Sequence, residues 1–171
     1  DLNKAFDRLH PVTLLNKLQH RGITGNVYRY ICNFLTQRTA AIKINNRVGR
    51  SFNIFQGSPQ GSTISPLLFA LLLCDFPRPP SADVMLSLYA DDIAIWCANR
   101  SLEHAREALQ TYLDTIVQYC QDNQLVISPD KTVAVTFGCR FLATYIPPRL
   151  YIDNNLIEVK DKARFLGLVF D

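Results

Sequence analysis

Apolar and polar residues alternate through the middle of the chain around a pair of adjacent carboxylates, Asp91 and Asp92. Apolar side chains at every second position lead into and out of this pair: Val84, Leu86, Leu88, Ile93 and Ile95. Such alternation predicts two β-strands that form a hairpin, with both aspartates at or near its turn. Two adjacent negative charges repel each other unless a cation lies between them or they face water. A solvated Asp-Asp turn is the ordinary alternative, because Asp is a favoured turn residue.

Apolar positions three and four residues apart predict four helices. The clearest runs from Ser101 to Asn123, with Ser101 as a candidate N-cap. Others are expected from about Pro11, from about residue 26 to 35, and from Ser65 to Leu73. The last of these is apolar on every side, so we expect it to be buried.

A period of two predicts further hairpins. Residues 39–55 are expected to turn at Asn45-Asn46, and residues 150–159 are expected to turn at Asn154-Asn155. A strand is expected over residues 132–137, and strand-like residues 165–170 close the chain. Because strands and helices alternate without a uniform β-α-β rhythm, the pattern predicts an α+β fold. We expect one small, mainly antiparallel sheet with helices on one face.

Composition narrows the class of protein. The 171 residues suggest one domain, or one domain and part of another, and 48% hydrophobic with 19% charged residues excludes a disordered chain. The longest apolar run, Leu67 to Cys74, is too short to span a bilayer. Five cysteines and three histidines show no ligand spacing, which argues against a disulfide framework and a zinc site and favours an intracellular protein. Because the chain opens on Asp1 without a leader, we expect a fragment of a longer protein.

The net charge of +3 hides an uneven distribution. Residues 1–50 hold nine Lys and Arg against two Asp, whereas the remaining residues are net acidic. A basic N-terminal third could bind a polyanion such as a template. Ordinary surface Arg on a solvated helix face is the alternative, and charge alone selects no particular Arg.

Three separated stretches carry candidate chemistry: Asp1 to Asp7, the loop Gln56 to Ser62, and Tyr89-Ala90-Asp91-Asp92. In this order they resemble motifs A, B and C of reverse transcriptases. Residues 123–132 resemble motif D, and Phe165-Leu166-Gly167 resembles motif E. The closest resemblance is to polymerases of non-LTR (LINE-type) retrotransposons, with group II intron maturases second. It spans residues 1–171, which would then form a partial reverse transcriptase domain.

The resemblance implies an RNA-directed DNA polymerase, a nucleotidyltransferase that adds deoxynucleotides to a primer 3′-OH during retrotransposition. The fold would be a polymerase palm, an antiparallel sheet of the ferredoxin-like (RRM) type, with partial fingers at about residues 39–55 and no thumb. Asp1, Asp91 and Asp92 would bind two Mg²⁺ ions, with Mn²⁺ as a substitute, because two-metal phosphoryl transfer needs carboxylate ligands. Lys131 would protonate the leaving pyrophosphate as a general acid; a solvent-facing lysine is the alternative.

Further roles follow from the same resemblance. The family pattern places the metal ligand five residues before the aromatic residue, which selects Asp1 over Asp7. Asp7 would then cap or orient the following helix. Phe6 would be the steric gate that rejects a ribose 2′-OH, with simple core packing as the alternative. Gln60 and Gly61 would contact nucleotide and template, with Gly61 allowing close backbone approach; alone, their loop would be an ordinary Gly/Pro turn. Tyr89 would lie beside the primer end, or else be a buried hairpin residue.

The implied partners are an RNA template, a DNA primer, deoxynucleoside triphosphates and the missing parts of a parent polyprotein (fingers, thumb and endonuclease), with no membrane. The location would be intracellular, in the nucleus during reverse transcription. Alone, the fragment is expected to polymerise poorly or not at all. One alternative is a decayed or domesticated palm that only binds nucleic acid. The others are a group II intron maturase-type enzyme and an RNA-dependent RNA polymerase, which would have no use for Phe6 as a gate.

Overall fold

The computed structural model describes residues 2–138 and 146–171, and the chain divides into two compact units. Of the described residues, unit 1 holds 2–3, 76–122, 126–138 and 146–171, and unit 2 holds 4–75 and 123–125. Unit 1 therefore combines two residues near the start of the chain with residues mostly from its second half.

Unit 2 contains four helices, of which α2, α3 and α4 agree closely with predicted ones and α1 was not predicted. They are α1 (Ala5–Arg8), α2 (Pro11–His20), α3 (Gly25–Leu35) and α4 (Ser65–Leu72). Helix α2 packs against α3 and α4. Lys17 of α2 donates to the carbonyl of Leu72 at 2.9 Å, which satisfies an orphan carbonyl at the C-terminal end of α4.

The prediction that α4 is buried on all sides is wrong. Leu68, Phe69 and Leu72 are buried, but Leu67 is 60% exposed. One stripe of this helix therefore faces away from α2, the helix on which it packs.

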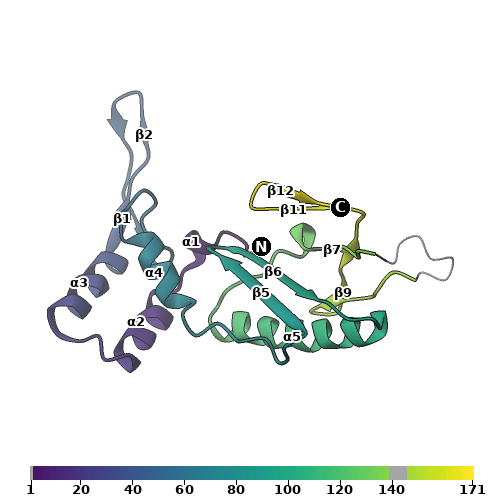
Figure 1. The fold of residues 1–171 in the computed structure, drawn as a ribbon. Helices are drawn as coiled ribbons and strands as arrows, with labels where there is room; N and C mark the ends of the chain where they lie inside the picture. Colours follow the sequence, from purple (N-terminus) through teal and green to yellow (C-terminus); the bar gives the residue numbers. More distant parts are fainter. Residues whose placement is uncertain (1, 139–145) are drawn as a thin grey trace. The chain divides into compact units, whose positions relative to one another are not determined.

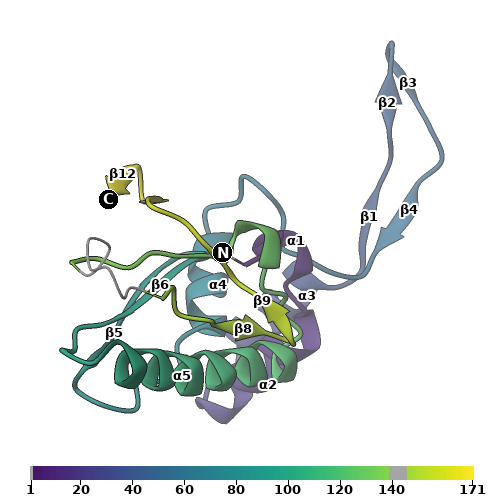
Figure 2. The same ribbon diagram turned by 90° about the vertical axis from the view of Figure 1, so that its right-hand side faces the viewer.

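The predicted hairpin of residues 39–55 is confirmed, and it belongs to unit 2. Strand β1 (Arg38–Ala40) pairs with β4 (Phe52–Ile54), and β2 (Lys43–Ile44) pairs with β3 (Arg47–Val48). Its turn is at Asn45-Asn46 as predicted, and both residues have positive φ, as a type I′ turn requires. In Figures 1 and 2 the hairpin extends away from the helices of its own unit.

Unit 1 is built on a second hairpin and one long helix. Strand β5 (Val84–Tyr89) pairs with β6 (Asp92–Cys97), and helix α5 (Leu102–Asp122) lies along one face of that hairpin (Figures 1 and 2). The predicted helix and its N-cap are confirmed, since the His104 amide donates to Ser101 Oγ at 3.3 Å.

Short elements complete unit 1. They are the 3₁₀ turn η1 (Pro129–Lys131) and strands β7 (Val133–Ala134), β8 (Tyr151–Ile152), β9 (Asn155–Leu156), β10 (Glu158–Val159), β11 (Ala163–Phe165) and β12 (Leu168–Phe170). The strand expected over residues 132–137 is only β7. The second predicted turn is one residue earlier than expected, at Asp153-Asn154, where both residues tolerate the left-handed conformation.

A mixed α and β architecture is observed, as expected, but the single sheet is not. The described residues pair as six two-stranded sheets, of which only β7–β10 is parallel. The core of unit 1 is a cluster of Leu113, Leu150, Ile152 and Ile157, on which Ile95 of β6 packs. Among the described residues, no helix has both the length and the apolar character needed to cross a membrane.

Candidate active site

The two adjacent aspartates lie at the turn of hairpin β5–β6, as the sequence predicted. Tyr89 is the register partner of Asp92, so Ala90 and Asp91 form the two-residue turn between them. Ala90 has a φ of 51°, a left-handed conformation that costs a residue with a Cβ about 1 to 2 kcal/mol. The turn therefore exposes Asp91 at the tip of the hairpin while Asp92 begins the returning strand.

Cross-strand register separates the two faces of this hairpin. Val84 and Ile95 belong to the face that packs on the unit 1 core. Asp92 shares the opposite face with Tyr89, and these side chains are not covered by α5. Tyr89 is 65% exposed, so the alternative of a buried hairpin tyrosine is wrong. The strand alternation thus presents a carboxylate and a phenol on the open face.

The residue that follows Asp1 is fixed against this turn. The Leu2 amide donates to the carbonyl of Asp91 at 2.9 Å, and Leu2 forms an antiparallel bridge with Ile127. Leu2 is only 1% exposed, so the contact is anchored in the interior of unit 1. Asp1 itself, the expected third carboxylate, lies outside the described residues.

The side chains at the turn offer the kind of ligand atom that magnesium binds. Asp91 and Asp92 offer carboxylate oxygens, the ligands that Mg²⁺ prefers, and both residues are partly exposed. Among the described residues, no group of three or more His, Cys, Asp and Glu side chains is arranged to hold a metal ion. Two carboxylates are therefore present at the turn, and a complete site requires a further ligand.

Lys131 also lies in unit 1, at the end of turn η1. Its amide donates to the Ser128 carbonyl at 3.3 Å, and the residue is exposed. The expected general-acid role of Lys131 remains a prediction.

In unit 2, the loop from Gln56 to Ser62 is bound to helix α1. The Ser58 amide donates to the Phe6 carbonyl at 2.9 Å, and the Gly57 amide donates to the Leu9 carbonyl at 2.7 Å. A Cβ on Gly57 would lie 2.8 Å from the carbonyl oxygen of Asp7, and Gly57 has a φ of +81°. Only glycine fits this close approach.

Arg38, at the base of hairpin β1–β4, binds the same loop. Its guanidinium donates to the carbonyls of Gln56 and Gly57, each at 2.6 Å, and to the Leu35 carbonyl at 3.2 Å. Partial burial lowers the pKa of Arg38. The sequence pattern predicted neither of these contacts, because Gly57 was only part of a loop rich in glycine and Arg38 was only one of the basic residues of the N-terminal third.

Two predicted nucleotide-contacting residues are positioned by this loop. The Phe6 ring packs on Phe69 with the ring centroids 4.8 Å apart, and Phe6 stays partly exposed. Gln60 is exposed and donates from Nε2 to Asp7 Oδ1 at 2.7 Å. Since an ionised carboxylate can only accept hydrogen bonds, this contact orients the Gln60 amide and leaves its oxygen as an acceptor.

One expectation for this region is corrected, because Asp7 does not cap the following helix. The N-cap of α2 is His10, whose ring accepts from the Thr13 amide at 3.4 Å. The expected approach of Gly61 to a nucleotide or template stays a prediction, and no other part of the described structure lies within 4 Å of where its Cβ would stand. Its φ of +82° gives the physical reason for glycine there, because residues with a Cβ rarely adopt that conformation.

Comparison with known proteins covers the whole chain. The family model described as reverse transcriptase (RNA-dependent DNA polymerase) matches residues 1–170. The chain is 29% identical over its full length to the RNA-directed DNA polymerase from mobile element jockey of Drosophila melanogaster, and 28% identical to the probable RNA-directed DNA polymerase from transposon BS of the same species. Over 99% of its length it is 27% identical to a Pol polyprotein from the type-1 retrotransposable element R2 of Popillia japonica. The chain spans 19% of the first two proteins and 26% of the third.

Proposed function

Because this chain belongs to the reverse transcriptase (RNA-dependent DNA polymerase) family, we propose that it is the catalytic core of an RNA-directed DNA polymerase of a non-LTR retrotransposon. The proposed reaction is transfer of a deoxynucleotide to a primer 3′-OH on an RNA template. Unit 1, with hairpin β5–β6 and helix α5, would be the palm, and hairpin β1–β4 of unit 2 would be finger-like.

The hydrogen bond from the Leu2 amide to the Asp91 carbonyl carries this proposal. It joins the segment that begins at Asp1 to the turn that bears Asp91 and Asp92, although these residues are far apart in sequence. A metal-binding role needs carboxylates from both segments close together, whereas a solvated Asp-Asp turn needs no such neighbour.

Asp1, Asp91 and Asp92 would hold the divalent ions, either Mg²⁺ or Mn²⁺. Bound there, two such ions would stabilise the charge on the attacking and leaving oxygens. The exposed face of β5–β6 leaves Asp92 and Tyr89 accessible to a primer end. Lys131 is proposed to give a proton from Nζ to the leaving pyrophosphate.

Unit 2 would supply sugar selection. The Phe6 ring packs on Phe69, and the Phe6 carbonyl accepts a hydrogen bond from the Ser58 amide, so both the ring and its backbone are positioned. An aromatic ring held in place is what exclusion of a 2′-OH requires. Gln60, oriented by Asp7, would present its amide oxygen to a hydroxyl or amine of the substrate, and Gly61 would lie beside it.

The proposed partners are the RNA template, the DNA primer and deoxynucleoside triphosphates, together with further segments of a longer polyprotein. This follows from the relatives, which are RNA-directed DNA polymerases several times the length of the chain. We also propose a nuclear site of action during reverse transcription.

Primer extension on an RNA template, by a longer polymerase that contains this chain, tests the proposal. Asp91→Asn and Asp92→Asn should each lower extension about 10³-fold, since metal ligation provides several kcal/mol of transition-state stabilisation. Asp83→Asn is the matched control, because it removes the same charge just before β5 at the other end of the hairpin. It should leave extension unchanged.

Both aspartates are partly exposed, so neither change should unfold the protein. Undiminished extension by both aspartate variants would overturn the proposal. If the parent protein binds RNA but extends no primer at any Mg²⁺ or Mn²⁺ concentration, the alternative of a palm that only binds nucleic acid would replace it.

A further inference from the structure

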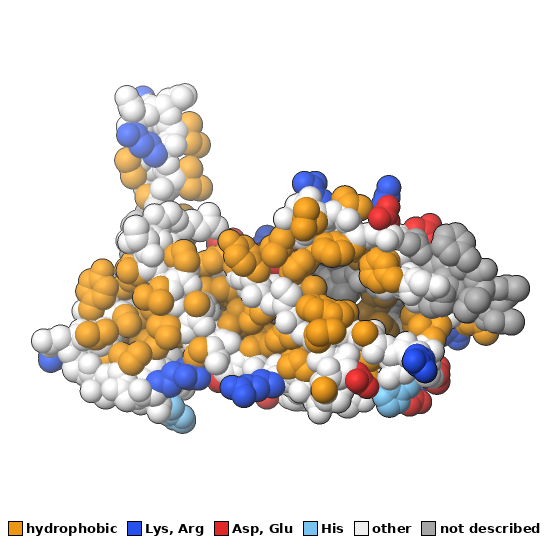
Figure 3. All heavy atoms as spheres, in the orientation of Figure 1, with side chains coloured by type: hydrophobic (Ala, Val, Ile, Leu, Met, Phe, Trp, Pro, Cys, Tyr) orange, Lys and Arg blue, Asp and Glu red, His pale blue; other side chains and the backbone are white. Residues whose placement is uncertain are grey.

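The hairpin of residues 38–55 has an unusual surface that the proposed catalytic chemistry does not use. Its strands are short, and most of its residues are exposed. Several large apolar side chains on it face solvent: Ile42, Ile44, Val48, Phe52 and Phe55. On the face seen in Figure 3, the hairpin carries hydrophobic and basic side chains side by side.

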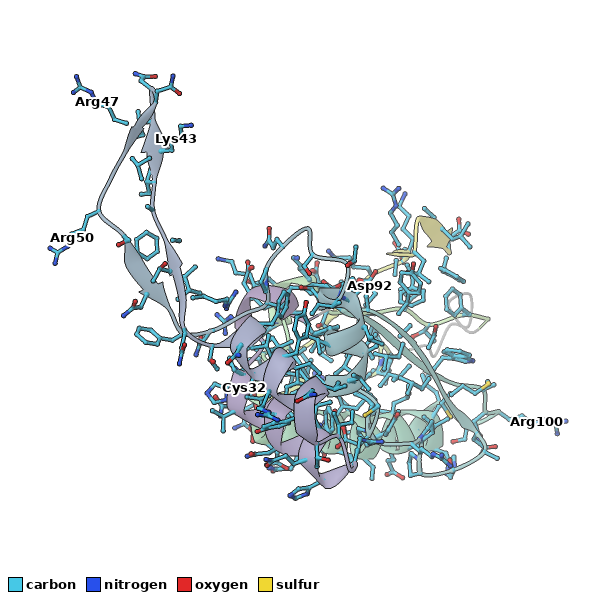
Figure 4. All side chains as sticks on the ribbon, turned by 90° about the vertical axis from the view of Figure 1, so that its left-hand side faces the viewer. Cys32, Lys43, Arg47, Arg50, Asp92 and Arg100 are labelled. Carbon is cyan, nitrogen blue, oxygen red and sulfur yellow. The ribbon has the colours of Figure 1, made fainter. Side chains whose placement is uncertain are left out.

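Charge on and around this hairpin has one sign. From Arg8 to Cys74 the sequence holds eight Lys and Arg and no Asp or Glu. Arg38 is engaged with backbone carbonyls at the base, so three cations remain on the outer part of the hairpin: Lys43, Arg47 and Arg50. In the described part of the chain, none of these three forms an ion pair. Figure 4 shows all three directed away from the hairpin.

The returning side of the hairpin has one extra residue near Arg50, because the two strand pairs differ in register by one residue. Ala40 pairs with Phe52, and the Gly49 amide donates to the Ile42 carbonyl at 2.8 Å. Arg50 and Ser51 therefore both lie opposite the single residue Ala41. An extra residue on one side of a strand pair, as in a β-bulge, bends that side and changes the direction of a side chain.

Exposed aromatic rings accompany the cations. Phe52 is 52% exposed and Phe55 is 78% exposed. Phe55 also lines a hollow at the base of the hairpin together with Arg38 and Asn53. Aromatic faces interleaved with cations are the combination that binds unpaired bases and their phosphates. A duplex would use the cations and leave the rings without partners.

We propose that hairpin 38–55 is a binding arm for single-stranded nucleic acid. Lys43, Arg47 and Arg50 contact phosphates, and Phe52 and Phe55 stack on unpaired bases. The proposal rests on the proposed function only for the source of the strand, which would be the template before it pairs. Binding itself requires neither metal nor nucleotide.

Fluorescence anisotropy of the 171-residue chain with a labelled single-stranded RNA, in EDTA, tests the proposal. The combined variant Lys43→Gln, Arg47→Gln, Arg50→Gln should weaken binding about tenfold or more. The plot of log K against log salt should become less steep by about 2, because the variant removes three phosphate contacts and each contact on a single strand contributes about 0.7 to the steepness. The matched control, Arg100→Gln with Arg149→Gln and Lys162→Gln, removes one Lys and two Arg from exposed positions of unit 1. It should change the slope by less than half as much.

A second variant separates stacking from charge. Phe52→Ala with Phe55→Ala should weaken binding of single-stranded RNA and leave binding of duplex RNA unchanged. All five arm side chains are exposed, so a circular dichroism spectrum identical to that of the parent chain is expected for both arm variants.

Any of three binding results would overturn the proposal. The charge variant could bind RNA as the parent does, the control could lose as much affinity as the arm variant, or the arm could bind anionic phosphatidylserine vesicles and not RNA. A dimer in solution that the arm variant abolishes would instead assign the apolar face to a second copy, and would also overturn it. Asp91→Asn with Asp92→Asn should keep RNA binding while extension is lost. Failure of the arm and failure of the proposed polymerase function are therefore measured separately.

Discussion

Replacing Gly57 by alanine tests whether the loop and helix α1 are held in one geometry. Gly57 combines two constraints, a φ of +81° and a backbone neighbour, Asp7, whose carbonyl oxygen would lie 2.8 Å from a new Cβ. The neighbouring atoms belong to the backbone and not to a flexible side chain, so the chain itself must move. The movement would disturb the bonds from Gly57 to Leu9 and from Ser58 to Phe6.

The magnitude follows from these two constraints. The left-handed conformation costs an alanine about 1 to 2 kcal/mol. Overpacking against the Asp7 backbone adds about 1 to 3 kcal/mol. Gly22→Ala is a matched control, since Gly22 has a φ of +79° and no atom within 4 Å of its Cβ position. The difference between the two variants therefore isolates the close approach.

Urea unfolding of this chain and of both variants measures the effect. Gly22→Ala should lose about 1 to 2 kcal/mol, and Gly57→Ala should lose about 2 to 5 kcal/mol in total. Thermal unfolding should separate the variants by several °C, since about 1 kcal/mol corresponds to about 2 to 4 °C in a chain of this size. Equal losses for the two variants would refute the close approach of Gly57 to Asp7.

Three further predictions concern single positions. Phe6→Ala should raise the ratio of ribonucleotide to deoxynucleotide incorporation about tenfold or more in primer extension, whereas Phe6→Leu should raise it less; an unchanged ratio would exclude Phe6 as the gate. Ala90→Gly should stabilise the protein by about 1 kcal/mol or less in urea unfolding, because glycine tolerates the left-handed turn position, and destabilisation would contradict the assigned turn. Burial raises the pKa of Cys120 to about 11, so between about pH 9 and 11 the unfolded chain has released the thiol proton and the folded chain has kept it. The free energy of unfolding should therefore fall with rising pH in that window, by about 2 to 3 kcal/mol more in the parent chain than in Cys120→Ala. If the free energy of unfolding changed with pH in the same way in both proteins, the thiol would not contribute.

Local sequence pattern predicted the elements well where the determinants are local. The hairpin turn at Asn45-Asn46, the turn at Ala90-Asp91 and the cap at Ser101 each depend on a few adjacent residues. Errors arose where neighbours in space decide the outcome. Leu67 is exposed because helix α4 is covered on one side only, and the expected strand over residues 132–137 shortens to the two residues that find a partner in β10.

For the candidate site too, some features were predicted from local sequence and others were visible only in the structure. The order of the motifs identified Phe6, Gln60, Gly61, Asp91 and Asp92 as candidates, because the residue types and their spacing are present in the chain itself. The partner of Asp7 could not be found this way. Its carboxylate binds Gln60, which is 53 residues away, and no periodicity relates the two positions.

The sequence by itself determined the family, the long helices, the main hairpins and the position of the paired aspartates at a turn, since periodicity, turn propensity and motif order are properties of neighbouring residues. The tertiary structure alone decided which distant segments support them. It joins Leu2 to Asp91 and brings Gly57 against Asp7. It also leaves Lys43, Arg47 and Arg50 without an acidic partner in the described part of the chain. Such contacts depend on the geometry of close packing and on backbone hydrogen bonds between remote residues, which a linear pattern does not encode.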